Sequence, residues 1–223
     1  MSSWIGGGPP KHAVLMRLKN YHATRTPPPS PTLDPVGADL KRNHPQAWIT
    51  FIVPTIGRAS LVDTLQSIQA QTDGMPWVAI VIGDGIAPAE CPEEILSDSR
   101  IGFLTLPSRL GHAGLVRNVG LAAAYTPWIA FVDDDDTVHP RYIQQILNEV
   151  RRTPSAMCVI VRMIRDGEVI PRQGAASIQK GNVGISFAIH SSVSQRFDAC
   201  ETEDYVFLHE MDRRRLPMVL SSD

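Results

Sequence analysis

From Trp48 onward, short apolar runs alternate with segments whose apolar residues recur at helical spacing. The apolar runs 49–53, 77–82, 101–106 and 128–132 predict buried strands. Helices are predicted between them, one capped by Ser60, one over 115–123, and one with Pro140 in its first turn. Strands that alternate with helices of this length favour a parallel sheet with right-handed crossovers. The sequence therefore predicts an α/β fold, a mostly parallel sheet flanked by helices, with a small hairpin at Asp166-Gly167.

The composition changes near residue 47. Eight of the 18 prolines lie in residues 1–47, including the run Pro-Pro-Pro-Ser-Pro at 27–31. Chain of this kind buries little apolar surface. We therefore predict an extended or disordered tail over 1–47 and a single domain over 48–223. The tail carries six basic and two acidic residues, so it is either a plain leader or a basic arm that docks on a partner chain.

Charge and cysteine content exclude several classes of protein. The formal net charge of −2 argues against a nucleic-acid binder that relies on backbone phosphates. No apolar run is long enough for a transmembrane segment, and the N-terminus does not resemble a secretory signal. The three cysteines form no CxxC pair, which argues against a disulfide framework or a cysteine-ligated zinc site. A soluble protein of the cytoplasm is expected, with attachment to a membrane surface left open.

The strongest chemical signal is a run of four carboxylates, Asp133 to Asp136, directly after the predicted strand Trp-Ile-Ala-Phe-Val. Ligands bind at the carboxyl ends of strands in open α/β sheets. Adjacent carboxylates repel one another unless a cation joins them, and Mg²⁺ commonly binds one or two carboxylates plus substrate phosphates. The run therefore predicts a divalent-cation site. The alternative is a solvated acidic turn before the next helix.

Arg117 and Asp204 are further candidates. Arg117-Asn118 lies on the helix before the acidic strand, where a guanidinium could contact a diphosphate; an ordinary surface arginine is the alternative. Asp204 shares the inward stripe of the last helix, whereas Glu203 is expected to point elsewhere. Asp204 is therefore either a catalytic group facing a cleft or a charge that complements the helix dipole. The sequence contains no P-loop, GxGxxG, GxSxG or HExxH pattern.

Six motifs occur in an order that resembles the GT-A glycosyltransferases of family 2, over about residues 48–215. They are Ile-Val-Pro-Thr-Ile-Gly-Arg at 52–58, Leu-Gln-Ser-Ile-Gln-Ala-Gln-Thr at 65–72, Gly-Asp-Gly at 83–85, Arg-Asn-Val-Gly at 117–120, Trp-Ile-Ala-Phe-Val-Asp-Asp-Asp-Asp at 128–136, and Glu-Asp at 203–204.

The resemblance implies a nucleotide-sugar transferase of Rossmann-like GT-A fold. It implies that Asp204 is the base of an inverting reaction. It places Asp135 and Asp136 on Mn²⁺ or Mg²⁺ and the diphosphate, and Asp133 towards the ribose. The residues implied to bind the nucleotide sugar, most often a UDP-sugar, are Pro54, Thr55, Arg58, Asp84, Arg117, Asn118, Asp133 and Asp134.

The acceptor is expected to be a glycan, a lipid or another hydroxyl compound. Gly181, Asn182 and Glu203 are predicted to lie on its side of the site, near the hairpin. Many members of the family continue beyond the Glu-Asp helix, so acceptor recognition is expected to be incomplete in this chain, or to be supplied by a partner chain or by further sequence. Two other functions stay open: a sugar-phosphate nucleotidyltransferase, and a silent module that binds nucleotide sugars. The first is disfavoured because the loop Thr-Ile-Gly-Arg lacks lysine.

Overall fold

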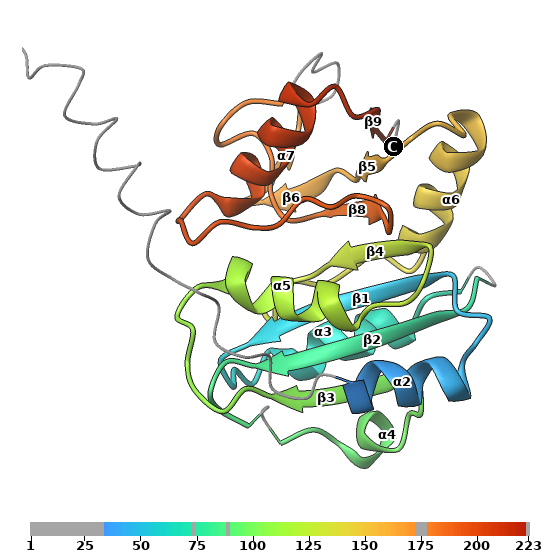
Figure 1. The fold of residues 1–223 in the computed structure, drawn as a ribbon, viewed down its shortest axis with the longest axis vertical. Helices are drawn as coiled ribbons and strands as arrows, with labels where there is room; N and C mark the ends of the chain where they lie inside the picture. Colours follow the sequence, from blue (N-terminus) through green and yellow to red (C-terminus); the bar gives the residue numbers. More distant parts are fainter. Residues whose placement is uncertain (1–33, 73–74, 88–89, 173–177, 222–223) are drawn as a thin grey trace, which may run out of the picture. The chain divides into compact units, whose positions relative to one another are not determined.

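A computed structural model describes residues 34–72, 75–87, 90–172 and 178–221. They contain a seven-stranded sheet of order β3-β2-β1-β4-β8-β5-β9 (Figure 1). The neighbours β3, β2, β1 and β4 are parallel, β8 runs antiparallel to β4 and β5, and β9 runs parallel to β5. The strands of this sheet are β1 (Ile49–Thr55), β2 (Trp77–Gly83), β3 (Ile101–Thr105), β4 (Trp128–Phe131), β5 (Cys158–Ile160), β8 (Phe187–His190) and β9 (Met218–Leu220).

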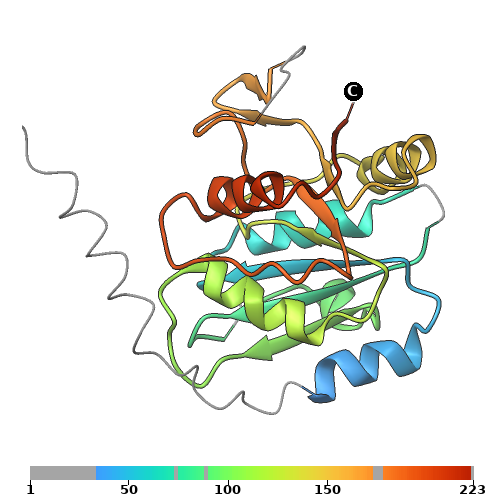
Figure 2. The ribbon, with the colours of Figure 1, turned by 45° about the horizontal axis from the view of Figure 1, so that its top comes forward.

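Helices cover both faces of this sheet (Figure 2). On one face α3 (Leu61–Gln69), the short α4 (Glu93–Leu96) and α6 (Tyr142–Arg152) pack on alternate residues of the central strands. On the other face lie α2 (Asp34–Asn43), α5 (Ala113–Ala123) and α7 (Glu203–Arg213). Because both faces are covered, every residue of β1 and β2 is buried, which explains their nearly continuous apolar sequences.

The helix α2 corrects the predicted tail. Its Leu40 is buried, and Leu40 and Val36 pack against Gly102 of β3. The single O–H of Tyr125 is shared between the carbonyls of Leu40 and His44, which accept it at 3.1 and 2.8 Å. Residues 34–47 therefore belong to the domain, and the predicted boundary at residue 47 is too late. The predicted tail before residue 34 lies outside the described residues.

The region after β5 differs most from the sequence expectation. A two-stranded sheet of β6 (Met163–Arg165) and β7 (Glu168–Ile170) forms the predicted hairpin, with Asp166 and Gly167 at positive φ in its turn. The strands β8 and β9 were not predicted, and the antiparallel β8 makes the sheet mixed. Among the described residues, no helix is both long and apolar enough to cross a membrane.

Two predicted helix starts also differ in detail. Ser60 is the residue before α3, but its side chain makes no capping hydrogen bond. Pro140 lies before α6, which begins at Tyr142, rather than within its first turn.

Candidate active site

The carboxyl ends of β1, β2 and β4 meet at one edge of the sheet. Thr55, the last residue of β1, pairs with Gly83, the last residue of β2, and the four aspartates follow β4 after the single residue Val132. A cavity of about 290 Å³, here called the strand-end cavity, opens at this edge. It is lined by every predicted nucleotide-binding residue except Asn118, namely Pro54, Thr55, Arg58, Asp84, Arg117, Asp133 and Asp134.

A second cavity, of about 460 Å³ and here called the acidic cavity, shares Arg117, Asp133 and Glu203 with the first. Its other acidic lining residues are Asp135, Asp136, Asp166, Glu201 and Asp204. The hairpin contributes Met163, Ile164 and Arg165, and Ile185 completes the apolar part. Because the two cavities share a wall, ligands in them would lie side by side at the Arg117 guanidinium.

The Asp134 side chain is buried, and both of its carboxylate oxygens accept hydrogen bonds from residues at the end of β1 and just after it. One carboxylate oxygen accepts hydrogen bonds from the Thr55 hydroxyl, at 2.6 Å, and from the Ile56 amide, at 3.2 Å. The other accepts from Arg58 at 3.0 Å. Asp134 thus joins the end of β4 to the end of β1 and holds the rim of the strand-end cavity in place.

Arg117 is the largest fully buried side chain of the described residues, and it lies between two carboxylates. It donates one hydrogen bond to Asp133 and another, of 2.9 Å, to Glu203. Its guanidinium also lies 5.4 Å from the centre of the Phe197 ring. A buried guanidinium needs such compensation, because an unpaired charge in the interior is strongly destabilising.

This ion triad corrects the prediction for Glu203. Its side chain does not point elsewhere but reaches from α7 to α5 and touches both cavities. The sequence carries no signal for this contact, since Arg117 and Glu203 lie far apart in the chain and only the fold brings them together.

Asp84 is buried at the end of β2. Its two carboxylate oxygens accept hydrogen bonds from the backbone amides of Leu110, at 2.6 Å, and Gly111, at 2.9 Å. The loop comes so close that a Cβ on Gly85 would lie 2.5 Å from the Arg109 nitrogen, so glycine is required there. Asp84 therefore fixes the loop that forms one side of the strand-end cavity.

Asn118, Gly181 and Asn182 do not join the other predicted residues. The Asn118 side-chain amide donates to the Phe197 carbonyl and accepts from the Phe197 amide, both at 2.9 Å, so it holds that loop. The Asn182 side chain accepts a hydrogen bond from the Gln179 amide. Neither Gly181 nor Asn182 lines the strand-end or the acidic cavity. The segment reaches the acidic cavity through Ile185 instead.

Asp204 and Asp136 are half-buried in the acidic cavity, and the pKa of each is raised. For Asp136 the main cause is burial, reinforced by the charges of Asp133 and Asp135. Burial is also the main cause for Asp204, with a further contribution from Glu203. The Tyr205 amide and the charges of Arg165 and Arg117 act in the opposite direction, lowering the pKa of Asp204.

The carboxylates of the acidic cavity could hold a divalent cation only together with ligands from a bound molecule. Within the described residues, no three His, Cys, Asp or Glu side chains are arranged to hold a metal ion by themselves. Asp135 and Asp136 offer hard oxygen ligands, and Arg58 already places a positive charge 2.6 Å from an Asp135 oxygen. This donor set suits a cation that takes one or two carboxylates and obtains its other ligands from phosphate oxygens.

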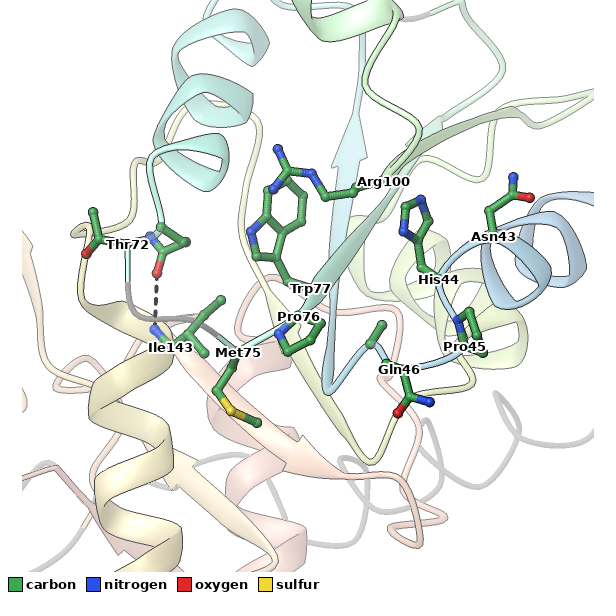
Figure 3. A pocket seen from close by; sticks show the side chains of 12 residues that line it. Asn43, His44, Pro45, Gln46, Thr72, Met75, Pro76, Trp77, Arg100 and Ile143 are labelled. Atoms are coloured by element: carbon green, nitrogen blue, oxygen red, sulfur yellow. Dashed lines mark hydrogen bonds between the residues drawn. The ribbon is translucent and has the colours of Figure 1, made fainter.

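A further pocket, of about 510 Å³, lies at the opposite edge of the sheet, where β1 and β2 begin (Figure 3). Arg100 stacks over Trp77 there, with its charged carbon 4.0 Å from the ring centre, and is held by Asp98. Gln71 also lines this pocket and accepts a hydrogen bond from the Ile143 amide. No Asp or Glu of the described residues lines this pocket, so the acidic chemistry lies at the other edge.

An open α/β sheet covered on both faces, with carboxylates and a buried arginine at the carboxyl ends of its parallel strands, places the molecule in the GT-A class. The family model described as "Glycosyl transferase family 2" matches residues 50–201. The chain belongs to this family.

The similarity of this chain to known proteins is consistent with the family assignment. The succinoglycan biosynthesis protein ExoO of Rhizobium meliloti is 32% identical over 102 residues, which are 44% of this chain and 28% of ExoO. A crystal structure of Staphylococcus aureus TarS, residues 1–349, has a TM-score of 0.62 at 18% identity, covering 79% of this chain and 58% of that one. Glucosyl-3-phosphoglycerate synthase of Mycobacterium tuberculosis has a TM-score of 0.57 at 18% identity, covering 88% of this chain and 76% of that one. The chain thus spans less than two thirds of ExoO and of the TarS structure.

Proposed function

We propose that the chain transfers a sugar, with inversion, from a UDP-sugar to the hydroxyl of a glycan, lipid or other acceptor, assisted by Mn²⁺ or Mg²⁺. One observation carries the proposal. The cavity at the strand ends and the cavity that holds Asp204 share the wall formed by Arg117, Asp133 and Glu203. A donor in the first cavity and an acceptor in the second would meet at this wall.

The donor side is built for a nucleotide. Pro54, Thr55 and Asp84 would surround the nucleoside. A carboxylate oxygen has two lone pairs, so Asp84 can accept a hydrogen bond from the uracil N–H while it holds the loop amides. TarS has been solved in complex with UDP and with UDP-GlcNAc, and glucosyl-3-phosphoglycerate synthase with UDP and either Mn²⁺ or Mg²⁺, which supports this choice of donor.

Asp204 would act on the acceptor. The acceptor oxygen forms a bond to the anomeric carbon, the bond from that carbon to the diphosphate oxygen breaks, and the diphosphate leaves with the electron pair. Asp204 takes the proton of the acceptor hydroxyl, and a single displacement inverts the configuration. A raised pKa makes the ionised form of Asp204 a stronger base than an ordinary aspartate.

Asp135 and Asp136 would hold the divalent cation against the diphosphate. The bound cation supplies Lewis-acid stabilisation of the charge on the departing nucleoside diphosphate. Arg117 keeps Asp133 and Glu203 fixed during the reaction, so the two cavities keep their relative positions.

The test is a calorimetric titration of the purified protein with UDP, GDP and TDP, each with and without Mn²⁺. Binding of UDP that requires Mn²⁺ is expected. Hydrolysis of a UDP-sugar in the absence of an acceptor would then separate a competent transferase from a silent binding module. Absence of binding for all three nucleotides would contradict the proposed donor class.

A further inference from the structure

Arg58 contacts the predicted cation ligand Asp135. Its Nη1 atom lies 2.6 Å from an oxygen of Asp135 and 3.0 Å from an oxygen of Asp134. The Arg58 and Asp135 side chains are both about half exposed, whereas Asp134 is buried. A single guanidinium nitrogen therefore bridges a buried and an exposed carboxylate.

The two carboxylates depend on Arg58 to different degrees. Asp134 keeps hydrogen bonds from the Thr55 hydroxyl and the Ile56 amide without it. Within the described part of the chain, Asp135 has Arg58 as its one hydrogen-bonding partner. The contact between Arg58 and Asp135 is thus not needed to hold the end of β4 against β1. Its main effect is to neutralise the negative charge of Asp135.

Neutralisation matters because four carboxylates follow one another at this strand end. Like charges at such spacing repel one another unless a positive charge lies between them. Arg58 supplies positive charge where the proposed divalent cation would bind. An ion pair that is half exposed to water is weak enough for a divalent cation to displace it.

We propose that Arg58 is a positioning residue that occupies the place of the cation on Asp135 in the donor-free protein and is displaced when cation and donor bind. This inference rests on the proposed cation role of Asp135. Displacement leaves the guanidinium next to Asp134, on the rim of the strand-end cavity where the donor diphosphate would lie.

Competition for Asp135 can be measured without catalysis. Mn²⁺ alone is titrated into wild type, Arg58→Gln, Arg58→Lys and Asp135→Asn, and free Mn²⁺ is followed by its electron paramagnetic resonance signal. Arg58→Gln is expected to bind Mn²⁺ about two- to fivefold more tightly, the range for loss of one exposed ion pair. Arg58→Lys keeps the charge and should bind as wild type does. Arg109→Gln is the matched control, since Arg109 lines the same cavity but faces Asp84.

The outcomes separate this inference from the proposed function. Unchanged or weaker Mn²⁺ binding in Arg58→Gln would overturn the competition, and so would equal tightening in Arg58→Lys. If Asp135→Asn binds Mn²⁺ as wild type does, or if none of the proteins binds Mn²⁺ even when UDP is added to supply phosphate ligands, the proposed cation site is wrong and the inference fails with it. Loss of binding in Asp135→Asn together with tightening in Arg58→Gln alone would support both.

Discussion

Asp204 is the residue on which the proposed chemistry depends most directly. It lies in the first turn of α7, on the inward stripe that also holds the buried Phe207, Leu208 and Met211. The helix therefore aims its carboxylate into the acidic cavity, where Asp136 lies as well.

Replacement of Asp204 by Asn should lower kcat for sugar transfer by about 10²–10⁴-fold, since the amide cannot accept the acceptor proton. Binding of UDP with Mn²⁺ should change little. Steady-state rates and calorimetry on the same preparation provide both measurements. Glu201→Gln is the control, because Glu201 lines the same cavity without a proposed role. Unchanged turnover in Asp204→Asn would refute its assignment as the base.

At the residue scale, the sequence predicted which side chains lie at the strand ends but not what holds them. Asp84, Asp133 and Asp134 were found because each lies just after a predicted buried strand. Their binding to loop amides, Arg117 and Thr55 depends on contacts between distant segments, which no local pattern encodes. The contact of Asn118 with Phe197, 79 residues away, was not foreseen for the same reason.

Among the elements, the hairpin β6–β7 supplies the exposed cation of the acidic cavity. The positive charge of Arg165 lowers the pKa of Asp204 and of Asp136. Its guanidinium lies against Gly184, so closely that a Cβ added to this glycine would be 2.8 Å from it. Arg117 also faces this cavity, but Asp133 and Glu203 already bind it. The hairpin thus adjusts the charge around the proposed base.

Substitution Arg165→Gln should move the acidic limb of the pH–rate profile to higher pH. The base must be ionised to act, and loss of the positive charge favours its protonated form, so activity should appear at higher pH than in wild type. The matched control is Arg172→Gln, because Arg172 lies just beyond β7 and pairs with Glu168. A limb that stays in place or moves to lower pH would contradict this role of Arg165.

The helix α2 was missed because its sequence carries little apolar periodicity. Leu40 is its one fully buried apolar side chain, and Gly37 lets it approach α5 closely. The strand β8 was missed because a run of only four residues gives no clear strand signal. By contrast, the long apolar runs of β1 and β2 were predicted almost to their ends, because burial on both faces requires them.

Two effects act in opposite directions at Gly37. Helix propensity alone would make Gly37→Ala stabilising by about 1 kcal/mol. A Cβ at this position would lie 2.4 Å from the Ala123 carbonyl oxygen, so the packing must give way. We expect a net loss of about 1–3 kcal/mol in the free energy of unfolding, measured with denaturant. A stabilised variant would show that α2 does not pack on α5 in solution.

On the scale of the whole molecule, the site is assembled from both halves of the sheet. Arg58, Asp84 and Arg117 come from the parallel half, and Glu203 and Asp204 follow β8 in the chain. A ligand that bridges the two cavities should therefore stabilise the entire domain against unfolding.

UDP and Mn²⁺ together should raise the melting temperature by about 5–10 °C at a hundredfold excess over the dissociation constant. UDP alone or Mn²⁺ alone should raise the melting temperature less. The diphosphate of UDP supplies oxygen ligands to the cation, and the cation neutralises the charge of the diphosphate. Differential scanning fluorimetry measures the shift, and chelation with EDTA should remove it. An equal shift in Asp135→Ala would contradict the proposed coupling of cation and donor.

The position of β8 also bears on the order in which the chain can fold during synthesis. β8 lies between β4 and β5 in the sheet, although it follows β5 in the sequence. The ribosome therefore releases β5 before the strand that connects it to the rest of the sheet. β1 to β4 can assemble as they emerge, because their neighbours precede or follow them closely. β5 and β9 can join only after residues 187–190 have left the exit tunnel, so the part of the sheet formed by β8, β5 and β9 is completed last.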